Sequence, residues 1–159
     1  MIKIDAIDKK ISDLLIEDGR MSCAKIAARI GDISERAVRY RIDRLIKNEV
    51  IQVRGNVNAT ALGLTVCADV FIEVEPAQVL DIAKTLSNYE SVSYIAYSTG
   101  DTDISIQVFA HDNSELFNFV TEVVGKIPGV RKTHISFVPI KIKDDHIWHI
   151  PSYCVSDKS

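Results

Sequence analysis

The spacing of apolar residues changes near residue 64, and this change constrains the fold more than any other feature. Before it, apolar residues recur every three to four positions; after it, they recur at every second position. A helical period and a strand period cannot serve the same element, so the two parts must form different structures. A chain of 159 residues has room for two small domains. We therefore expect an α+β protein with a helical N-terminal domain followed by a mixed domain.

The first 50 residues predict a helix-turn-helix domain. A first helical stripe ends at Gly19 and consists of Ile7, Ile11, Leu14 and Leu15. Ser22 and Ser34 are suitable N-caps for two further helices, which a short turn at residues 31–34 separates. Two short helices joined by a tight turn, the second with arginines on its outer side, are typical of DNA-binding domains.

The charges of the two parts have opposite sign. Residues 1–58 hold 12 Lys and Arg against 9 Asp and Glu, whereas the remaining residues hold 7 against 13. A basic domain on an acidic body favours contact of the first with a polyanion, although a solvated helix face explains such a cluster equally well. If the polyanion is DNA, we expect Arg36, Arg39 and Tyr40 in the major groove. The candidates for contacts with the DNA backbone are Lys25, Ser34, Arg41, Arg44 and Arg54.

Residues 51–63 are expected to link the domains. Their weak alternation around Gly55 and Asn56 predicts a short strand pair, so the N-terminal domain would resemble a winged helix.

Residues 64–143 predict the order βαββαβ. The strands are expected over 66–74, 92–97, 104–110 and 130–142, with one helix beginning near Pro76 and another capped by Asn113 or Ser114. The pattern repeats at an offset of 38 residues: Ile82 corresponds to Val120, and Leu86 to Val124. Two such halves make a ferredoxin-like sandwich with both helices on one face of a four-stranded sheet. The other face would carry Cys67, Phe71, Ile95, Tyr97 and Phe109, which favours a homodimer that buries it.

The composition bears on disulfide bonds, membrane spans, secretion and metal binding. The three cysteines are far apart and outside any CxxC spacing, which favours a reducing cytoplasm over a disulfide framework. No apolar run is long enough for a membrane span, and the N-terminus lacks a secretory signal. In the tail, residues 144–159, the possible metal ligands are His146, His149 and Cys154. A metal site is not the expectation, because such a tail can be disordered and no second cluster completes a tetrahedral set. We expect no metal or cofactor.

The order and spacing of several short motifs resemble the Lrp/AsnC family of transcription regulators. The N-terminal motifs are Ile7-Asp8-x-x-Ile11, Asp18-Gly19-Arg20, Ile26-Ala27, Ser34-x-x-x-Val38-x-x-Arg41-Ile42-x-x-Leu45, Val50-Ile51 and Leu62-Gly63. The later ones are Thr99-Gly100-x-x-Asp103, Ile127-Pro128-Gly129-Val130, Thr133 and Lys141. Three departures stand out: the turn at residues 31–34 is one residue longer, Glu49 replaces a glycine with Asn48 as the left-handed alternative, and Thr102 replaces an aromatic residue.

The resemblance implies a homodimer, often assembled into tetramers or octamers, that binds promoter DNA. The second domain is then a RAM domain, which binds an amino acid near the loop between its second and third strands. The implied effector residues are Thr99, Gly100, Asp101, Thr102, Asp103 and Thr133. Independently, Gly100 permits close backbone approach, turn N–H groups can hold a carboxylate, and Asp101 or Asp103 can pair with an ammonium group. The alternative is an ordinary turn in which an aspartate caps its own backbone.

The competing class is an enzyme. Some proteins that resemble this family are tetrapyrrole-pathway decarboxylases with His and Arg clusters in the sheet domain, but the second expected strand, Val92 to Tyr97, holds no such cluster. The sequence shows no nucleophile–His–Asp set and no phosphate-binding glycine loop. We therefore expect a regulator and not an enzyme.

Overall fold

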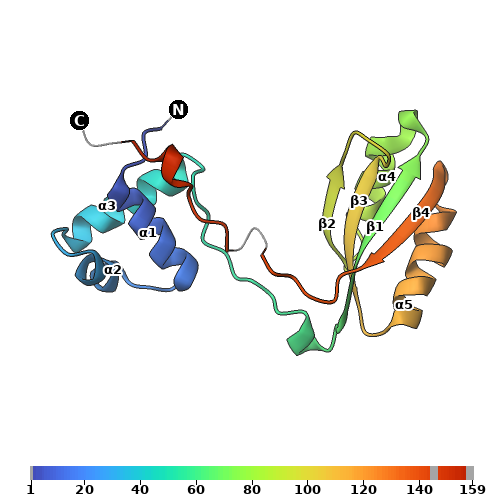
Figure 1. Ribbon diagram of the computed structural model, residues 1–159, viewed down its shortest axis with the longest axis horizontal. Helices are drawn as coiled ribbons and strands as arrows, with labels where there is room; N and C mark the ends of the chain where they lie inside the picture. The colour runs from blue at the N-terminus through green and yellow to red at the C-terminus, as the bar shows by residue number, and fades with distance from the viewer. Residues whose placement is uncertain (1, 144–146, 157–159) are drawn as a thin grey trace. The chain divides into compact units, whose positions relative to one another are not determined.

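A computed structural model describes residues 2–143 and 147–156, and these residues form two compact units (Figure 1). The first unit, the head, combines residues 2–56 with the described residues after 141. The second unit, the sheet domain, comprises residues 57–141. The chain thus leaves the head after residue 56 and returns to it before its C-terminus.

The three predicted helices form the head. They are α1 (Ala6–Glu17), α2 (Cys23–Ile30) and α3 (Glu35–Lys47). Ser22 and Ser34 cap α2 and α3 as predicted, because each hydroxyl oxygen accepts a hydrogen bond from a backbone N–H three residues later, at 3.2 Å. Ile11, Ile26 and Val38 are fully buried and bring the helices together around one core. Helix-turn-helix folding is therefore confirmed.

The end of α3 differs from the expectation. Asn48 is not left-handed; the positive φ of 57° belongs to Glu49. The N–H of Glu49 donates to the carbonyl of Ile46, and the N–H of Val50 donates to that of Leu45, both at 2.9 Å. These two bonds form a Schellman motif, which requires the left-handed residue at position 49 whatever its side chain.

Residues 51–58 form no strand, so the predicted strand pair of a wing is absent from this segment. The alternation of these residues was too weak to define a buried face, and most of their side chains are exposed. Instead, the segment is extended as far as a single 3₁₀ turn at Thr60–Leu62. The described residues of the tail, 147–156, are ordered and belong to the head (Figure 1).

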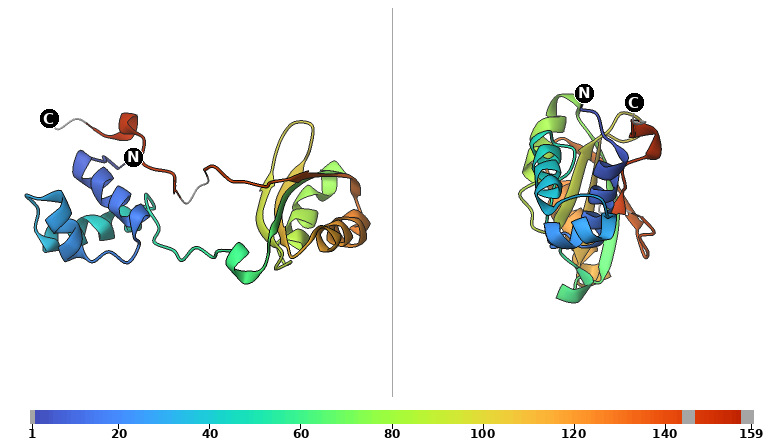
Figure 2. Two further views of the ribbon diagram at one scale, coloured as in Figure 1. Left: turned by 60° about the horizontal axis from the view of Figure 1, so that its bottom comes forward. Right: turned by 90° about the vertical axis from the view of Figure 1, so that its left-hand side faces the viewer.

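The sheet domain has the predicted order βαββαβ. Its strands are β1 (Val66–Val74), β2 (Val92–Tyr97), β3 (Ile104–Ala110) and β4 (Val130–Phe137), and all neighbours pair antiparallel in the order β2-β3-β1-β4. The helices α4 (Val79–Leu86) and α5 (Asn113–Asn118) cover the same face of the sheet (Figure 2). This is the ferredoxin-like arrangement. β4 ends five residues before the predicted boundary at residue 142.

The repeat at an offset of 38 residues marks the core. Ile82, Leu86, Val120 and Val124 are all buried with the inward residues of β1 and β3. The second helix begins one residue earlier than expected, because Asp112 is its N-cap and accepts a hydrogen bond from the Glu115 N–H at 2.8 Å. After residue 118 the helix continues as a π-helical turn and a 3₁₀ turn up to Lys126.

The open face of the sheet differs from the prediction in β2. A β-bulge at Ser93 lets Tyr94 pair with Gln107, which shifts the following residues by one. Ile95 and Tyr97 therefore pair with Ile106 and Ile104 and lie on the helix side, not on the open face. Cys67, Phe71 and Phe109 alternate with the inward residues of β1 and β3 and lie on the open face, where the side chain of Gln107 donates to Asp69 at 2.9 Å. On the open face, the bulge therefore exchanges the predicted Ile95 and Tyr97 for Tyr94 and Ala96, which pair with Gln107 and Ser105.

Candidate DNA-binding and effector-binding sites

The outer side of α3 is an exposed surface with cationic and aromatic side chains. Arg36, Arg39 and Tyr40 are all exposed, and the ring of Tyr40 remains 69% accessible. Arg39 pairs with Glu35 at 2.8 Å across one helical turn, but both side chains are more than half exposed. A solvent-exposed pair of this kind is worth little, so a phosphate or a base can replace the carboxylate. These three side chains are free to contact a ligand outside the head.

The other predicted backbone contacts fall into two groups. Ser34, Lys25 and Arg54 are exposed. The Ser34 oxygen caps α3, which leaves its O–H free to donate to a phosphate at the helix N-terminus. Arg41 and Arg44, in contrast, turn toward α1 and form ion pairs there.

These ion pairs form a charged cluster of Asp5, Asp8, Arg41 and Arg44. The Asp8 carboxylate is completely buried and accepts from Arg41 at 2.7 Å and from Arg44. Arg41 also donates to Asp5 at 2.8 Å, so it joins both carboxylates. Among the described residues, the buried Nε of Arg44 has no hydrogen-bond partner. The cluster connects α3 to the N-terminus of α1. In this structure, Arg41 and Arg44 therefore hold these two helices together.

Within the cluster, the ion pair between Asp5 and Arg41 favours the charged forms of both side chains. Burial by itself raises the pKa of Asp5, but hydrogen bonds from the Asp8 N–H and from Arg41 outweigh it and lower that pKa below its ordinary value of 3.8. Asp5 and Asp8 additionally form a reciprocal capping box, in which each carboxylate accepts from the backbone N–H of the other residue. Sequence reasoning missed Asp8, although a carboxylate between Ile4 and Ile11 on one helical stripe was a usable signal.

The predicted effector loop joins β2 to β3. Gly100 has a φ of 154°, a conformation that favours glycine, and a Cβ there would meet open space. Asp103 holds the base of the loop: its Oδ2 accepts from the Val74 N–H at 2.9 Å, and its own N–H donates to the Ile72 carbonyl at 3.0 Å. Asp101 and Thr99 are exposed, and Thr102 is half-buried. Asp103 is thus engaged as a structural cap, and Asp101 is the exposed carboxylate.

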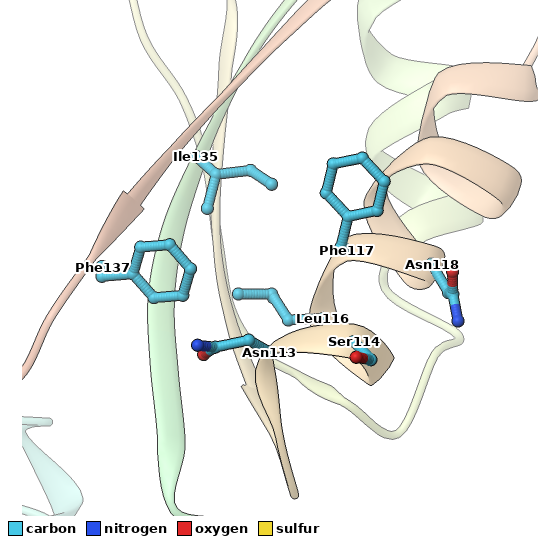
Figure 3. A pocket seen from close by; sticks show the side chains of 7 residues that line it. All are labelled: Asn113, Ser114, Leu116, Phe117, Asn118, Ile135 and Phe137. Atoms are coloured by element: carbon cyan, nitrogen blue, oxygen red, sulfur yellow. The ribbon is translucent and has the colours of Figure 1, made fainter.

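Thr133 lies near the same end of the sheet as this loop. It pairs with Ile72 in β1, whose other neighbour is Ile104 at the start of β3. β1 therefore separates Thr133 from the loop. A cavity of about 350 Å³ lies elsewhere in the sheet domain, between α5 and the edge strand β4, and its walls are mostly apolar (Figure 3). Its lining consists of Asn113, Ser114, Leu116, Phe117, Asn118, Ile135 and Phe137, and no predicted effector residue contributes to it.

The possible metal ligands of the tail, which were not the favoured interpretation, are only partly described. Within residues 2–143 and 147–156, no three His, Cys, Asp or Glu side chains gather as a metal site would require. His149 instead contacts Asp13 of α1 at 2.8 Å, whereas His146 lies outside the described residues. In the same described part of the chain, no helix is long and apolar enough to cross a membrane.

A helix-turn-helix head joined to a ferredoxin-like domain defines the class of two-domain transcription regulators. Residues 4–46 match the AsnC-type helix-turn-helix domain, and residues 67–148 match the Lrp/AsnC ligand binding domain. The chain therefore belongs to the Lrp/AsnC family of HTH-type transcriptional regulators.

Relatives and solved structures agree with this assignment. The HTH-type transcriptional regulator PH0140 of Pyrococcus horikoshii is 36% identical over 138 residues, which are 86% of this chain and 87% of that protein. AsnC of E. coli has a similar fold, with a TM-score of 0.81 at 21% identity over 90% of this chain and 97% of that one. The regulator NMB0573 of Neisseria meningitidis, solved in complex with L-Met, gives a TM-score of 0.82 at 23% identity over 89% and 94% of the two chains.

Proposed function

We propose that this protein binds double-stranded promoter DNA through α3 and responds to an amino acid bound by its sheet domain. The observation that carries the proposal is the exposed group Arg36, Arg39 and Tyr40 on a helix that the Asp8 cluster anchors. Arginines on such a helix can reach guanine O6 and N7 bidentately, and Tyr40 can donate to a phosphate. Ser34, Lys25 and Arg54 are proposed as contacts with the DNA backbone.

Arg41 and Arg44 are not proposed as direct contacts with DNA. Their guanidinium groups are already held by Asp8 and Asp5, and breaking those bonds would uncover a buried carboxylate. Their contribution to DNA binding is indirect, through the orientation of α3. Substitution of the exposed Arg36 or Arg39 should therefore weaken DNA binding directly, whereas substitution of Arg41 or Arg44 should first destabilise the head.

A homodimer suits both domains. Two heads about one DNA turn apart read a pseudo-palindrome, which a single head cannot do. Cys67, Phe71 and Phe109 provide the apolar part of the open sheet face that a second copy would cover. Further assembly into tetramers or octamers follows the family pattern. A regulator acts in the compartment that holds the DNA, which supports a cytoplasmic location.

An amino acid is the proposed effector. The L-Met complex of NMB0573, a protein of similar fold, supports this ligand class. In this chain we propose that backbone N–H groups around Gly100 hold the carboxylate and that Asp101 pairs with the ammonium group. Thr99 and Thr102 are candidates for further polar contacts, whereas Thr133, across β1 from the loop, is a weaker candidate for the same ligand. Asp103 keeps the loop in shape through Val74.

The test of DNA binding starts with genome-wide footprinting of the bound protein, which supplies an operator. In gel-shift titrations on that operator, Arg36→Ala or Arg39→Ala should weaken binding by about 1–3 kcal/mol if the contact is bidentate to guanine. Lys84→Ala, which removes one exposed positive charge from α4, is the matched control. Wild-type affinity in both arginine variants would remove them from the interface.

The effector is tested by calorimetry with each of the twenty amino acids. Asp101→Asn should weaken the binding of the amino acid that gives a signal, because it removes the negative charge opposite the ammonium group. Asp103→Ala is the comparison, since it should disturb the loop through Val74 while the dimer survives. An unchanged isotherm for Asp101→Asn would remove Asp101 from the site.

The alternative function, a tetrapyrrole-pathway decarboxylase-like enzyme, is not supported, since relatives such as PH0140 and LrpA of Pyrococcus horikoshii are named as transcriptional regulators. The absorption spectrum of the purified protein separates the two functions. A co-purifying tetrapyrrole would favour the enzyme, and its absence together with operator binding favours the regulator.

A further inference from the structure

The C-terminal segment, residues 147–156, returns to the N-terminus and pairs with it. Val155 and Ile4 form a parallel β-bridge, and the Ser156 N–H donates to the Ile4 carbonyl at 2.8 Å. The Ser156 hydroxyl donates to the same carbonyl at 2.9 Å. Ile4 itself is only 7% exposed. One end of the segment is therefore fixed directly before α1 begins, as Figure 1 shows.

The segment meets α1 at two further places. His149 contacts the Asp13 carboxylate at 2.8 Å, and Lys9 contacts its other oxygen at 2.9 Å. Ile147, Trp148 and Ile150 line one side of a cavity of about 450 Å³. Leu15 and Ile16 of α1 and the segment Val50 to Arg54 line its other sides. The contacts of His149, Val155 and Ser156 favour a docked strap over a loose tail.

The strap ends beside the residue that anchors α3. Ile4 is followed by Asp5, whose carboxylate caps α1 and accepts from Arg41 at 2.8 Å. Ser156 is hydrogen-bonded to Ile4, Ile4 is joined to Asp5 by a peptide bond, and Asp5 is paired with Arg41. Because Arg41 belongs to α3, these bonds connect the strap to the helix with the exposed arginines. Among the described residues, the hydrogen bonds, the β-bridge and the cavity of the strap involve α1, Ile4 and the segment after α3, and none of them involves α2 or the outer side of α3.

We propose that residues 147–156 are a positioning element of the DNA-binding head. By holding Ile4, the strap holds Asp5 where it receives Arg41, and so sets the orientation in which α3 presents Arg36 and Arg39. This inference rests on the proposed function, since it needs a DNA-binding head to position. It assigns to the C-terminal segment a role in DNA affinity without any contact with DNA.

The first test is Ser156→Pro in the full chain, which removes both hydrogen bonds to Ile4. Tyr153→Ala is the matched control, because Tyr153 is in the same segment and is 88% exposed. Ser156→Pro should weaken operator affinity by about five- to tenfold, the usual scale of such coupling, and Tyr153→Ala should leave it unchanged. The slope of log affinity against log salt should stay the same in both variants, because no phosphate contact is lost.

The second test restores the strap covalently. In a chain that carries Cys23→Ala, Cys67→Ala and Cys154→Ala, the substitutions Ile4→Cys and Val155→Cys are combined with Ser156→Pro. Oxidation should give a cross-link within one chain and return operator affinity to that of the same chain without Ser156→Pro. A cross-link between two chains would show that the strap belongs to a partner and overturn the proposal. So would a cross-linked protein whose affinity stays low.

Docking itself has a readout that needs no DNA. Trp148 is the single tryptophan of the chain and is already 63% exposed, so Ser156→Pro should raise its quenching by iodide only moderately. Increased quenching with unchanged operator affinity, or a changed salt slope, would overturn the positioning role while the regulator function stands. A wild-type protein that footprints no DNA at all would instead refute the proposed function.

Discussion

Asp8→Ala should destabilise the head more than any other single carboxylate substitution in it. The Asp8 carboxylate is completely buried and is the shared acceptor of Arg41 and Arg44. Its removal leaves two guanidinium groups without their main partner and opens the reciprocal bond with the Asp5 N–H. Arg41 keeps only its bond to Asp5.

The magnitude follows from the burial of the cluster. Removing one member of a buried ion pair costs about 3–5 kcal/mol, because an uncompensated charge remains. The side chains of Arg41 and Arg44 are 23% and 32% exposed, so water replaces part of what they lose. We therefore expect the lower end, about 3 kcal/mol, which is a large part of the stability of a small domain at about 5–15 kcal/mol.

Denaturant unfolding followed by circular dichroism measures this loss in the helical transition. Asp43→Ala is the control, since it removes an exposed carboxylate from α3 and should change stability by less than about 0.5 kcal/mol. The triple variant Asp8→Leu, Arg41→Met, Arg44→Leu should recover most of the loss, because apolar residues of similar size often replace buried ion pairs without cost. A loss below about 1 kcal/mol for Asp8→Ala would refute the reasoning that the cluster anchors α3.

Three further predictions concern backbone strain and pH. Glu49→Gly should stabilise the head by about 1 kcal/mol, because glycine carries no penalty at the positive φ that ends α3, and no gain in denaturant unfolding would contradict this. Gly129→Ala should destabilise the sheet domain by about 1–2 kcal/mol, since φ there is 92° and a Cβ would lie 1.9 Å from the flexible Gln78 amide. Adding Gln78→Ala should relieve only the clash, and full recovery would show that backbone strain is unimportant. For pH, burial raises the pKa of Asp5 and Asp13, but their hydrogen bonds lower both pKa values below 3.8 on balance. The stability that the two ionised carboxylates give the head is present above that value and is lost as pH falls through their pKa values in the folded protein. The thermal midpoint of the head should therefore decrease when the pH is lowered below about 4. Asp13→Asn should flatten that profile, and an unchanged one would contradict the assignment.

The sequence by itself determined the features that depend on near neighbours. Ser22 and Ser34 cap helices because each needs only a backbone N–H three residues away. The alternation over residues 66–74 defines β1 and its buried side, and the repeat of Ile82 at Val120 marks both core helices. These local rules fix the domain order and the fold class.

Tertiary structure alone decided which arginines face outward. Arg36, Arg39, Arg41 and Arg44 occupy one basic stretch, and only Asp8, more than thirty residues earlier, turns the last two inward. The same holds for Ile95, which a single bulge at Ser93 moves to the other face of the sheet. It also holds for Ser156, whose partner Ile4 lies at the opposite end of the chain. Each outcome depends on a distant partner or on a shift in strand pairing, and hydrophobic periodicity carries no information about either.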